Sequence, residues 1–196
     1  MTGQQVIELL IESAALLDGH FRLSSGLHSA QYLQCAVALQ HPPVAEKLGH
    51  ALATRWRESS APGQISAVVS PALGGLIIGH ELGRALGTRA CFTERVSGSM
   101  TLRRGFELGP GLGVLVVEDV VTTGKSTLET IDVIRFCGGE PVGVACIANR
   151  SGKPQVGDLP LVSLISLDIP TYPEDDCPQC EAREPIQKPG SRPVPA

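Results

Sequence analysis

Two adjacent acids, Glu118 and Asp119, stand just before a segment suited to hold an anion. This segment is Thr-Thr-Gly-Lys-Ser at residues 122–126, and the acids themselves follow an apolar run at residues 114–117. A strand that leads through such a loop into a helix presents unpaired N–H groups and the positive end of the helix dipole. The residues therefore predict a phosphate site, although an ordinary helix N-cap with surface hydroxyls would use the same residue types.

The paired carboxylates restrict the ligand, because they would repel a phosphate group that carried nothing else. Carboxylates accept hydrogen bonds from the vicinal hydroxyls of ribose, and they also hold Mg²⁺ directly or through water. The pair thus predicts a ribose 5-phosphate unit, with Mg²⁺ as the cofactor. In the alternative interpretation, one acid faces solvent and the other caps the loop. The stretch is not a P-loop, because that motif requires a glycine where this chain has Asp119.

The elements that must position these residues alternate along the chain. Buried strands are expected at residues 65–69, 90–93, 114–117, 142–148 and 161–167, and helices at residues 76–86 and 125–136. This order predicts an α/β fold with a central, mainly parallel sheet that is flanked by helices. Such sheets bind ligands at the carboxyl ends of their strands. Three loops should meet there, namely PALGG at 71–75, EDVVTTGKS at 118–126 and NRSGKP at 149–154.

Composition and charge exclude several classes of protein. The 196 residues are 42% hydrophobic and 18% charged, which suits one globular domain. A net charge of −4 provides no general basic field for nucleic acid. We expect neither a membrane span nor a signal peptide, since the first residues include Glu8 and Glu12 and no basic segment. Four of the six cysteines stand singly among apolar residues, which favours the reducing cytoplasm.

The stretch VLVVEDVVTTGKS resembles the signature of the type I phosphoribosyltransferases, which bind phosphoribosyl pyrophosphate. The resemblance implies that the two acids contact the ribose hydroxyls and that the loop holds the 5-phosphate. It implies this set of residues for phosphoribosyl pyrophosphate: Glu118, Asp119, Val120, Val121, Thr122, Thr123, Gly124, Lys125 and Ser126. PALGG is similar to the diphosphate loop of the family, which implies roles for Ala72, Gly74 and Gly75.

Other stretches resemble the bacterial branch of the orotate phosphoribosyltransferases. They are FRLSSGLHSAQYLQ at 21–34, IANRSG at 147–152 and LDIPTYPEDDCPQC at 167–180. The resemblance implies a small N-terminal hood at about residues 1–40, a homodimer, and transfer of the phosphoribosyl group to orotate in pyrimidine biosynthesis. The orotate contacts that it implies are Ser25, Gly26, Thr122 and Arg150. A guanidinium pairs well with the orotate carboxylate, although a solvated loop arginine would look the same in sequence.

The polar stretch at residues 94–105 is long for a connection in a compact domain. The resemblance implies a mobile loop here that closes over the diphosphate. Its catalytic candidates are Arg95, Arg103 and Arg104. The chain departs from many orotate enzymes at two places, because this loop contains no lysine and Ser24 stands where they have a lysine.

The remaining features are less informative in sequence. We predict a single domain over residues 1–170 and an irregular, partly mobile, Pro-rich tail over 171–196. In this tail, Cys177-Pro-Gln-Cys180 could be half of a zinc site, a redox pair or a packing feature. The five histidines show no spacing typical of metal ligands, so no metal held directly by protein side chains is predicted.

Two alternatives to transfer onto orotate remain open from the sequence. One is a phosphoribosyltransferase for another base, which would not need the hairpin or Arg150. The other is a non-catalytic protein that senses phosphoribosyl pyrophosphate and regulates RNA or a gene, which the missing loop lysine favours and the acidic net charge opposes. The expected partners are therefore small-molecule substrates, with neither nucleic acid nor membrane.

Overall fold

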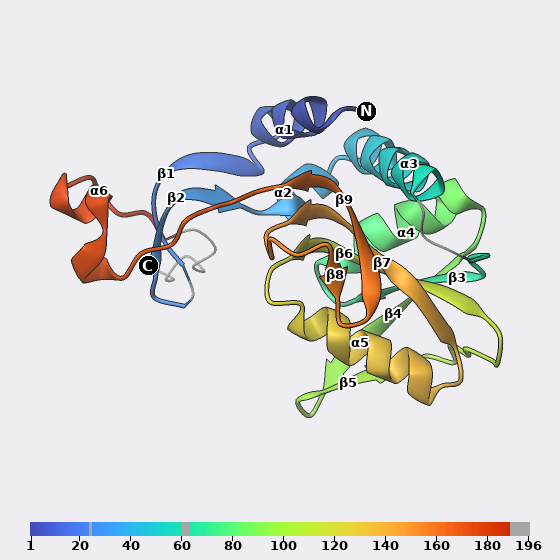
Figure 1. Ribbon diagram of the computed structural model, residues 1–196. Coiled ribbons are helices and arrows are strands. Elements are labelled where there is room, and N and C mark those ends of the chain that lie inside the picture. The colour runs from blue at the N-terminus through green and yellow to red at the C-terminus, as the bar shows by residue number, and fades with distance from the viewer. Residues whose placement is uncertain (24, 60–62, 189–196) are drawn as a thin grey trace, which may run out of the picture.

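The computed structural model describes residues 1–23, 25–59 and 63–188 (Figure 1). The helices are α1 (Gly3–Glu12), α2 (Cys35–Leu39), α3 (Pro42–Glu58), α4 (Gly75–Leu86), α5 (Lys125–Phe136), the 3-10 helix η1 (Glu174–Asp176) and α6 (Pro178–Glu181). The strands are β1 (Leu16–Arg22), β2 (His28–Leu33), β3 (Ala67–Pro71), β4 (Arg89–Val96), β5 (Ser99–Leu102), β6 (Gly113–Val121), β7 (Glu140–Asn149), β8 (Gln155–Val156) and β9 (Leu159–Ser166). The expected order of strands and helices is therefore confirmed.

A seven-stranded sheet forms the centre of the molecule, in the order β5-β4-β3-β6-β7-β9-β8. The five inner strands β4, β3, β6, β7 and β9 pair in parallel. The edge strands β5 and β8 pair antiparallel with β4 and β9. This arrangement confirms the predicted α/β fold with a mainly parallel sheet. It also brings the carboxyl ends of β3, β6 and β7 to one edge, where the three predicted loops follow them.

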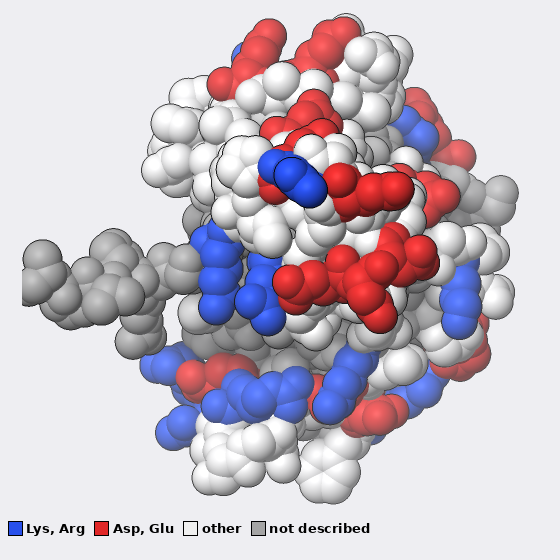
Figure 2. Space-filling model, turned by 90° about the vertical axis from the view of Figure 1, so that its left-hand side faces the viewer, with Lys and Arg blue, Asp and Glu red and all other residues white. Residues whose placement is uncertain are grey.

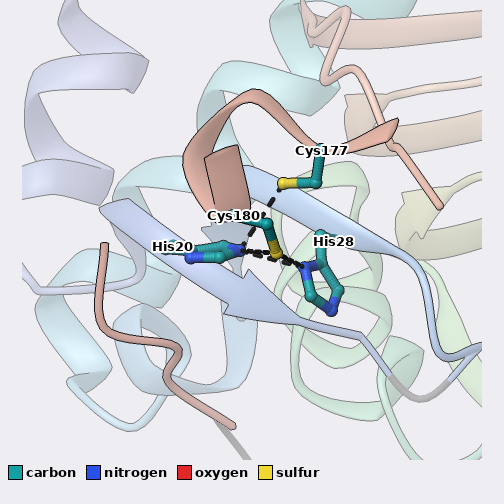
Figure 3. A group of neighbouring side chains, drawn as sticks. All are labelled: His20, His28, Cys177 and Cys180. Carbon is teal, nitrogen blue, oxygen red and sulfur yellow. Dashed lines mark hydrogen bonds between the residues drawn. The ribbon is translucent and has the colours of Figure 1, made fainter. Parts of the chain in front are cut away.

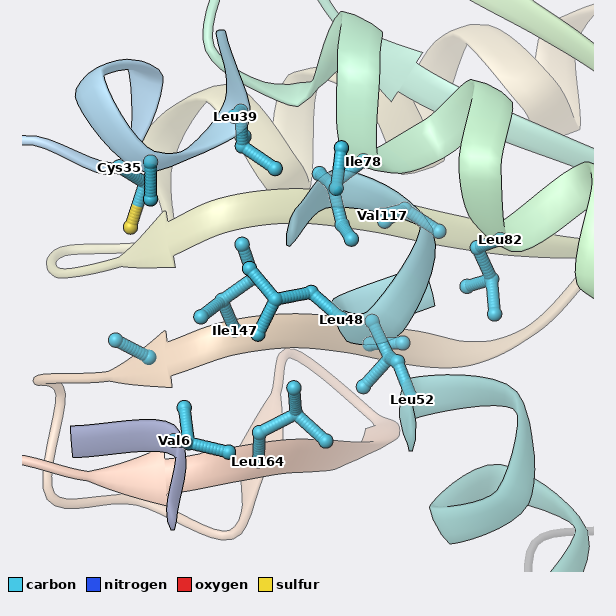
Figure 4. Close-up of a cluster of buried hydrophobic side chains, with 14 of the residues drawn as sticks. Val6, Cys35, Leu39, Leu48, Leu52, Ile78, Leu82, Val117, Ile147 and Leu164 are labelled. Atoms are coloured by element: carbon cyan, nitrogen blue, oxygen red, sulfur yellow. The ribbon is translucent and has the colours of Figure 1, made fainter. Parts of the chain in front are cut away.

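Helices cover both faces of this sheet, because successive residues of its strands point to opposite sides. Leu115 and Val117 of β6 face the core shared with α1 to α4, which Figure 4 shows in part. Val114 and Val116 face a second core that includes Ile131 and Ile134 of α5. Burial of each large aliphatic side chain contributes about 1.5–3 kcal/mol, so the two cores hold the central strands firmly.

Local signals in the sequence fix several helix ends. At α1, the Thr2 hydroxyl accepts from the Gln5 N–H and the Gln5 side chain accepts from the Thr2 N–H, a reciprocal capping box. At α4, Gly87 ends the helix in the left-handed conformation, with φ of 71°. Proline in the first turn begins α3.

Residues 94–105 differ from the long polar loop that the sequence predicted. β4 continues to Val96, and β5 pairs with it through Glu94–Thr101 and Val96–Ser99. The intervening Ser97 and Gly98 both have positive φ, at 49° and 89°, which suits the tight turn of a right-twisted hairpin. The first part of the stretch is therefore a β-hairpin, hereafter the arginine hairpin. Its expected mobility stays a prediction.

A small two-stranded sheet of β1 and β2, hereafter the hood sheet, projects from the main body (Figure 1). The C-terminal segment, residues 171–188, returns along it instead of forming only an irregular tail. His28 and Tyr172 exchange backbone hydrogen bonds in both directions. Arg22 and His20 similarly exchange bonds with Gln187. The C-terminal segment is ordered because its backbone pairs with the edges of β1 and β2. Composition alone does not reveal this pairing. Ser24 and residues 189–196 lie outside the described residues.

This return of the chain also corrects our interpretation of the histidines and cysteines. His20 and His28 lie on the paired strands β1 and β2, and Cys177 and Cys180 on the segment that crosses them. The four side chains meet in space. Their sequence separations show no spacing typical of metal ligands. The side chains become neighbours only through the antiparallel pairing of β1 and β2 and the return of a distant segment. Among the described helices, none combines the length and the apolar character needed to cross a membrane.

Candidate active site

The acids Glu118 and Asp119 lie near the end of β6, the central strand between β3 and β7. Glu118 is only 6% exposed, and it accepts a hydrogen bond from the Ser126 hydroxyl at 2.9 Å and a longer one from Thr127 at 3.4 Å. Asp119 accepts from the Val120 N–H at 2.8 Å. The first turn of α5 thus anchors one acid, while the other is held by its own backbone.

The burial of this pair changes its protonation. Desolvation raises the pKa of Glu118 to about 8; the Ser126 hydrogen bond opposes this, and the nearby Asp119 charge adds to it. Burial also raises the pKa of Asp119, against the effect of the Val120 N–H. A buried carboxylate beside a partly buried one does not readily carry charge together with it at neutral pH. A ligand that brings hydroxyl donors or a cation would restore the negative charge of both acids. The sequence pattern predicts a ligand of this kind.

The phosphate loop, residues 122–126, connects β6 to α5. Gly124 occupies the left-handed region, with φ of 73°, directly before the helix begins at Lys125. The Thr123 hydroxyl accepts weakly from the Lys125 N–H at 3.4 Å. The loop borders a cavity of about 210 Å³, whose lining is Val121, Thr122, Thr123, Gly124, Leu128, Ser151, Lys153, Gln155, Val156 and Gly157.

This cavity adds three polar side chains that sequence reasoning missed, Ser151, Lys153 and Gln155. Ser151 and Lys153 belong to the loop after β7, which the sequence predicts at the ligand edge without a role for either, and Gln155 begins β8. The available signal was the pairing of neighbouring parallel strands, since Val121 lies opposite Asn149. A larger hollow of about 610 Å³ lies elsewhere, lined partly by Met1, Arg55 and Glu58, and includes none of the predicted site residues.

The diphosphate loop, residues 71–75, packs closely against the acids. A β-carbon at Gly74 would lie 2.7 Å from Asp119 Oδ1, and one at Gly75 would lie 2.8 Å from the Val117 carbonyl oxygen. Both distances are shorter than van der Waals contact allows, so only glycine fits this approach. The N–H of Ala72 donates to the Thr93 carbonyl at 2.7 Å. The structure therefore brings this loop and the end of β6 together, as the sequence predicted.

Arg150 directly follows β7, beside the phosphate loop. Its backbone N–H donates to the Val121 carbonyl at 2.8 Å. Its Nε atom is buried and has no hydrogen-bond partner among the described residues, and burial lowers the pKa of the guanidinium. A buried donor without an acceptor is costly. Arg150 therefore has an unsatisfied donor at the sheet edge where the loop after β6 begins.

The three candidate arginines are all held in ion pairs. Arg95 pairs with Glu129 of α5 and also donates to the Gly98 carbonyl at 2.7 Å. Arg104 pairs with Glu94 at 3.0 Å, and Arg103 is 3.9 Å from the same carboxylate. Arg104 also lies over the Phe92 ring. Recruitment of these arginines to a diphosphate would require exchange of these exposed pairs, each of which contributes little.

Ser25 and Gly26 form the turn of the hood sheet, and both are exposed. Gly26 has φ of 86° and donates its N–H to the Leu23 carbonyl. The Ser25 hydroxyl accepts from Leu27 at 3.4 Å. These bonds are local, and the turn projects with the hood sheet (Figure 1). The structure thus gathers the acids, both loops and Arg150 at one edge, but leaves the two hood residues apart.

Comparison with known proteins places this arrangement in a family. Residues 38–169 match the family described as "Phosphoribosyl transferase domain". The chain is 49% identical to the orotate phosphoribosyltransferase of Erythrobacter litoralis, over 98% of this chain and 99% of the relative. It is 45% identical to that of Desulforamulus reducens, over 99% of this chain and all of the relative. The chain belongs to the orotate phosphoribosyltransferase family.

Solved orotate phosphoribosyltransferases have the same fold. The enzyme of Aeropyrum pernix superposes with a TM-score of 0.69 at 26% identity, covering 83% of this chain and 93% of that one. The Mycobacterium tuberculosis enzyme, in complex with inorganic phosphate, gives 0.67 at 27% identity, covering 84% and 95%. Membership in the orotate phosphoribosyltransferase family makes this protein a transferase, and the resemblance noted in the sequence is confirmed.

Proposed function

We propose that this protein transfers the 5-phosphoribosyl group of phosphoribosyl pyrophosphate to orotate. An orotate nitrogen forms a bond to C1 of ribose as the bond from C1 to the diphosphate oxygen breaks. The products are orotidine 5′-monophosphate and diphosphate. The observation that carries the proposal is the meeting of buried Glu118 and partly buried Asp119 with the loops at residues 122–126 and 71–75 at one sheet edge.

The end of β6 and the loop after it would bind phosphoribosyl pyrophosphate. Glu118 and Asp119 would accept hydrogen bonds from the ribose hydroxyls. The backbone and hydroxyls of residues 120–126 would surround the 5-phosphate, with the positive end of α5 directed at it. As positive charge develops on ribose during the displacement, the two carboxylates would stabilise it.

The leaving diphosphate would lie against Ala72, Gly74 and Gly75, where the absence of side chains exposes backbone N–H groups. Arginines of the hairpin would neutralise it as they leave Glu94 and Glu129. Figure 2 shows that Lys and Arg gather mainly in the lower half of one face, below a predominantly acidic region. A local group of cations suits a multiply charged anion on a chain whose net charge is −4.

Arg150 and Thr122 would bind orotate, and Ser25 and Gly26 of the hood sheet would cover it. The unpartnered Nε of Arg150 supports this role, because a carboxylate would satisfy it. Since Ser25 and Gly26 are exposed in the present conformation, this part of the proposal requires the hood sheet to approach the sheet edge when the substrate is bound.

Mg²⁺ fits the chemistry of this edge, because two carboxylates offer the oxygen ligands that it prefers. Glu118 and Asp119 would hold it, directly or through water and the ribose hydroxyls. Bound there, it would neutralise charge on the leaving diphosphate. The homodimer and the cytoplasmic location expected from the sequence stay predictions.

The decisive experiment follows the loss of orotate absorbance with phosphoribosyl pyrophosphate and Mg²⁺. We expect turnover by the natural chain and its loss, by at least about a hundredfold, when Asp119 is replaced by asparagine. A variant at Asp158, an exposed acid paired with Arg135, is the matched control. Binding of phosphoribosyl pyrophosphate without turnover would favour the regulatory alternative, and turnover of another base would favour a different transferase.

A further inference from the structure

Four potential metal ligands converge between the hood sheet and the C-terminal segment (Figure 3). They are the rings of His20 and His28 and the thiols of Cys177 and Cys180, whose ligand atoms all lie within 4.8 Å of one another. Cys177 and both rings are buried, and Cys180 is partly exposed. None of the four belongs to the proposed substrate site, and none has a role in the transfer reaction.

The tautomer of His20 is fixed by its outer hydrogen bond. Its Nδ1 atom lies 3.0 Å from the backbone carbonyl oxygen of Glu184. A carbonyl can only accept, so Nδ1 of a neutral ring carries the hydrogen and Nε2 presents a lone pair toward the cluster. Metal-binding histidines commonly have such an outer acceptor, which orients the ring.

The four inner atoms form one closed group rather than separate hydrogen-bonded pairs. The single lone pair on His20 Nε2 faces His28 Nδ1 at 3.0 Å, Cys177 Sγ at 3.5 Å and Cys180 Sγ at 3.7 Å. Cys180 Sγ also lies 3.2 Å from His28 Nδ1, so the two imidazoles and Cys180 are all in mutual contact. Nε2 of His28 is buried without a partner in the described part of the chain, so no outer acceptor fixes that ring. One cation at the centre would use all four inner atoms together.

The distances match the edges of a tetrahedron around zinc. Bonds of about 2.05 Å to nitrogen and about 2.3 Å to sulfur give nitrogen–sulfur edges of ~3.6 Å and a nitrogen–nitrogen edge of ~3.3 Å. Three of the four nitrogen–sulfur distances here are 3.2, 3.5 and 3.7 Å, and every pair of ligand atoms lies within 4.8 Å. The nitrogen–nitrogen distance is 3.0 Å. Four of the six edges are therefore already close to those that would enclose the ion.

We propose that His20 Nε2, His28 Nδ1, Cys177 Sγ and Cys180 Sγ form a structural Zn²⁺ site. Two imidazoles and two thiolates in tetrahedral arrangement select zinc, and four protein ligands leave no open position for substrate. Both thiols lose their protons when the ion binds. The site is separate from the Mg²⁺ that the transfer reaction would use.

The site connects the hood sheet with the C-terminal segment, two parts of the chain that lie outside the main sheet. A two-stranded sheet is marginally stable by itself, and the C-terminal segment carries only η1 and α6. The histidines come from the two strands and the cysteines from this segment, so one ion links three pieces of backbone. It reinforces the backbone bonds that His28 forms with Tyr172 and lies below the bond between the Leu23 N–H and the Leu27 carbonyl.

Metal content tests the proposal first. The full-length protein, expressed with zinc and dialysed against metal-free buffer, should retain about one Zn²⁺ per chain by elemental mass spectrometry. Replacement by Co²⁺ should give the visible bands of a tetrahedral site and a thiolate-to-cobalt charge-transfer band. Cys180→Ser and His28→Asn should lose the bound zinc. Cys137→Ser and His80→Asn, both outside the cluster, should keep it and serve as matched controls.

Three results would overturn the proposal. One is protein without zinc and without the cobalt bands even when metal is supplied during expression. The second is a disulfide between Cys177 and Cys180, detected as a mass about two daltons lower with loss of two titratable thiols. Equal zinc content in the cluster variants and the controls would also contradict it, because the ion would then be bound elsewhere.

Hydrogen exchange then tests what the ion does. Removal of zinc with a chelator should speed exchange of the His28, Tyr172 and Gln187 amides by at least about tenfold, because their backbone bonds join the linked pieces. The amides of Val116 and Val117 in β6 should be unaffected. Unchanged exchange in the hood sheet of a protein shown to have lost its zinc would refute the structural role.

Discussion

The sheet edge and the hood sheet are stabilised in different ways, although both contribute residues to the proposed site. β6 ends between two parallel neighbours and two layers of helices, so Glu118 is fixed by packing on every side. The hood sheet has two strands, and backbone bonds with residues 171–188 supply much of its support. The edge is therefore suited to rigid binding of the phosphoribosyl group. The hood sheet is suited to move over the base, and it needs a separate device to keep its shape.

The largest effect of a substitution should come from the phosphate loop, which belongs to the rigid sheet edge. Gly124→Val places a branched side chain at φ of 73°, with its β-carbon 3.2 Å from a Val156 methyl group, in the space that we propose for the phosphate. We expect the affinity for phosphoribosyl pyrophosphate to fall by at least about a hundredfold in calorimetric titration. Gly87→Val is the matched control, since Gly87 has φ of 71° and open surroundings.

Both glycine variants should lose about 1–2 kcal/mol of unfolding free energy from the left-handed backbone. Only the Gly124 variant should lose ligand affinity. If a folded Gly124→Val protein binds the ligand as well as the Gly87 variant does, the phosphate loop is assigned wrongly.

Arg150→Ala should affect the base and spare the phosphoribosyl group. A charge-assisted hydrogen bond contributes about 1.5–3 kcal/mol, so kcat/KM for orotate should fall about tenfold to a hundredfold or more. The affinity for phosphoribosyl pyrophosphate should barely change. Arg135→Ala, which removes an exposed arginine paired with Asp158, should leave both values intact. Loss of phosphoribosyl pyrophosphate binding with an unchanged KM for orotate would instead make Arg150 a phosphate ligand.

The buried acid should make stability depend on pH. Because the pKa of Glu118 is raised to about 8 in the folded protein, the folded state keeps a proton that the unfolded chain releases. The stabilisation is fully present below the ordinary pKa of glutamate and is lost as pH rises to about 8. In denaturant titrations, Glu118→Gln should flatten this decline by a few kcal/mol at most. An equally steep decline in the variant would show that another group is responsible.

The arginine hairpin provides an intermediate case between the two regions. It belongs to the main sheet through β4, but its end is held by exposed ion pairs. We expect the amides of residues 97–105 to exchange several-fold more slowly when phosphoribosyl pyrophosphate and Mg²⁺ are bound. Amides of β6 should exchange equally in both states. Equal protection of the hairpin with and without ligand would remove its proposed role as a lid.

The smallest effect should come from a single contact of the hood sheet. The buried Ser29 hydroxyl donates to the Pro170 carbonyl at 3.0 Å. Ser29→Ala should weaken local protection of the His28 and Tyr172 amides by about 1 kcal/mol, with global stability nearly unchanged. Thr54→Ala, which removes an exposed hydroxyl bond to His50 on α3, is the control. A loss spread over the whole main sheet would show that the two regions unfold as one.

The sequence by itself determined the main sheet, the start of α5 and the order of the ligand loops. These features depend on local rules, namely hydrophobic periodicity, capping and the position of glycine, which neighbouring residues express without the rest of the chain. The paired acids and the loop after them could be located at the end of a strand for the same reason. The Ser97-Gly98 turn was a local signal too, but the polar residues around it hid the hairpin.

Only the tertiary structure decided the burial of Glu118, the unpartnered Nε of Arg150 and the ion pairs of the arginine hairpin. It alone brought His20 to Cys177, which is 157 residues away in sequence. Such contacts depend on where the C-terminal segment returns after β9, and on desolvation by several elements at once. Neither the return of this segment nor the desolvation of a side chain can be inferred from the spacing of a few residues, because each arises from the path of the whole chain.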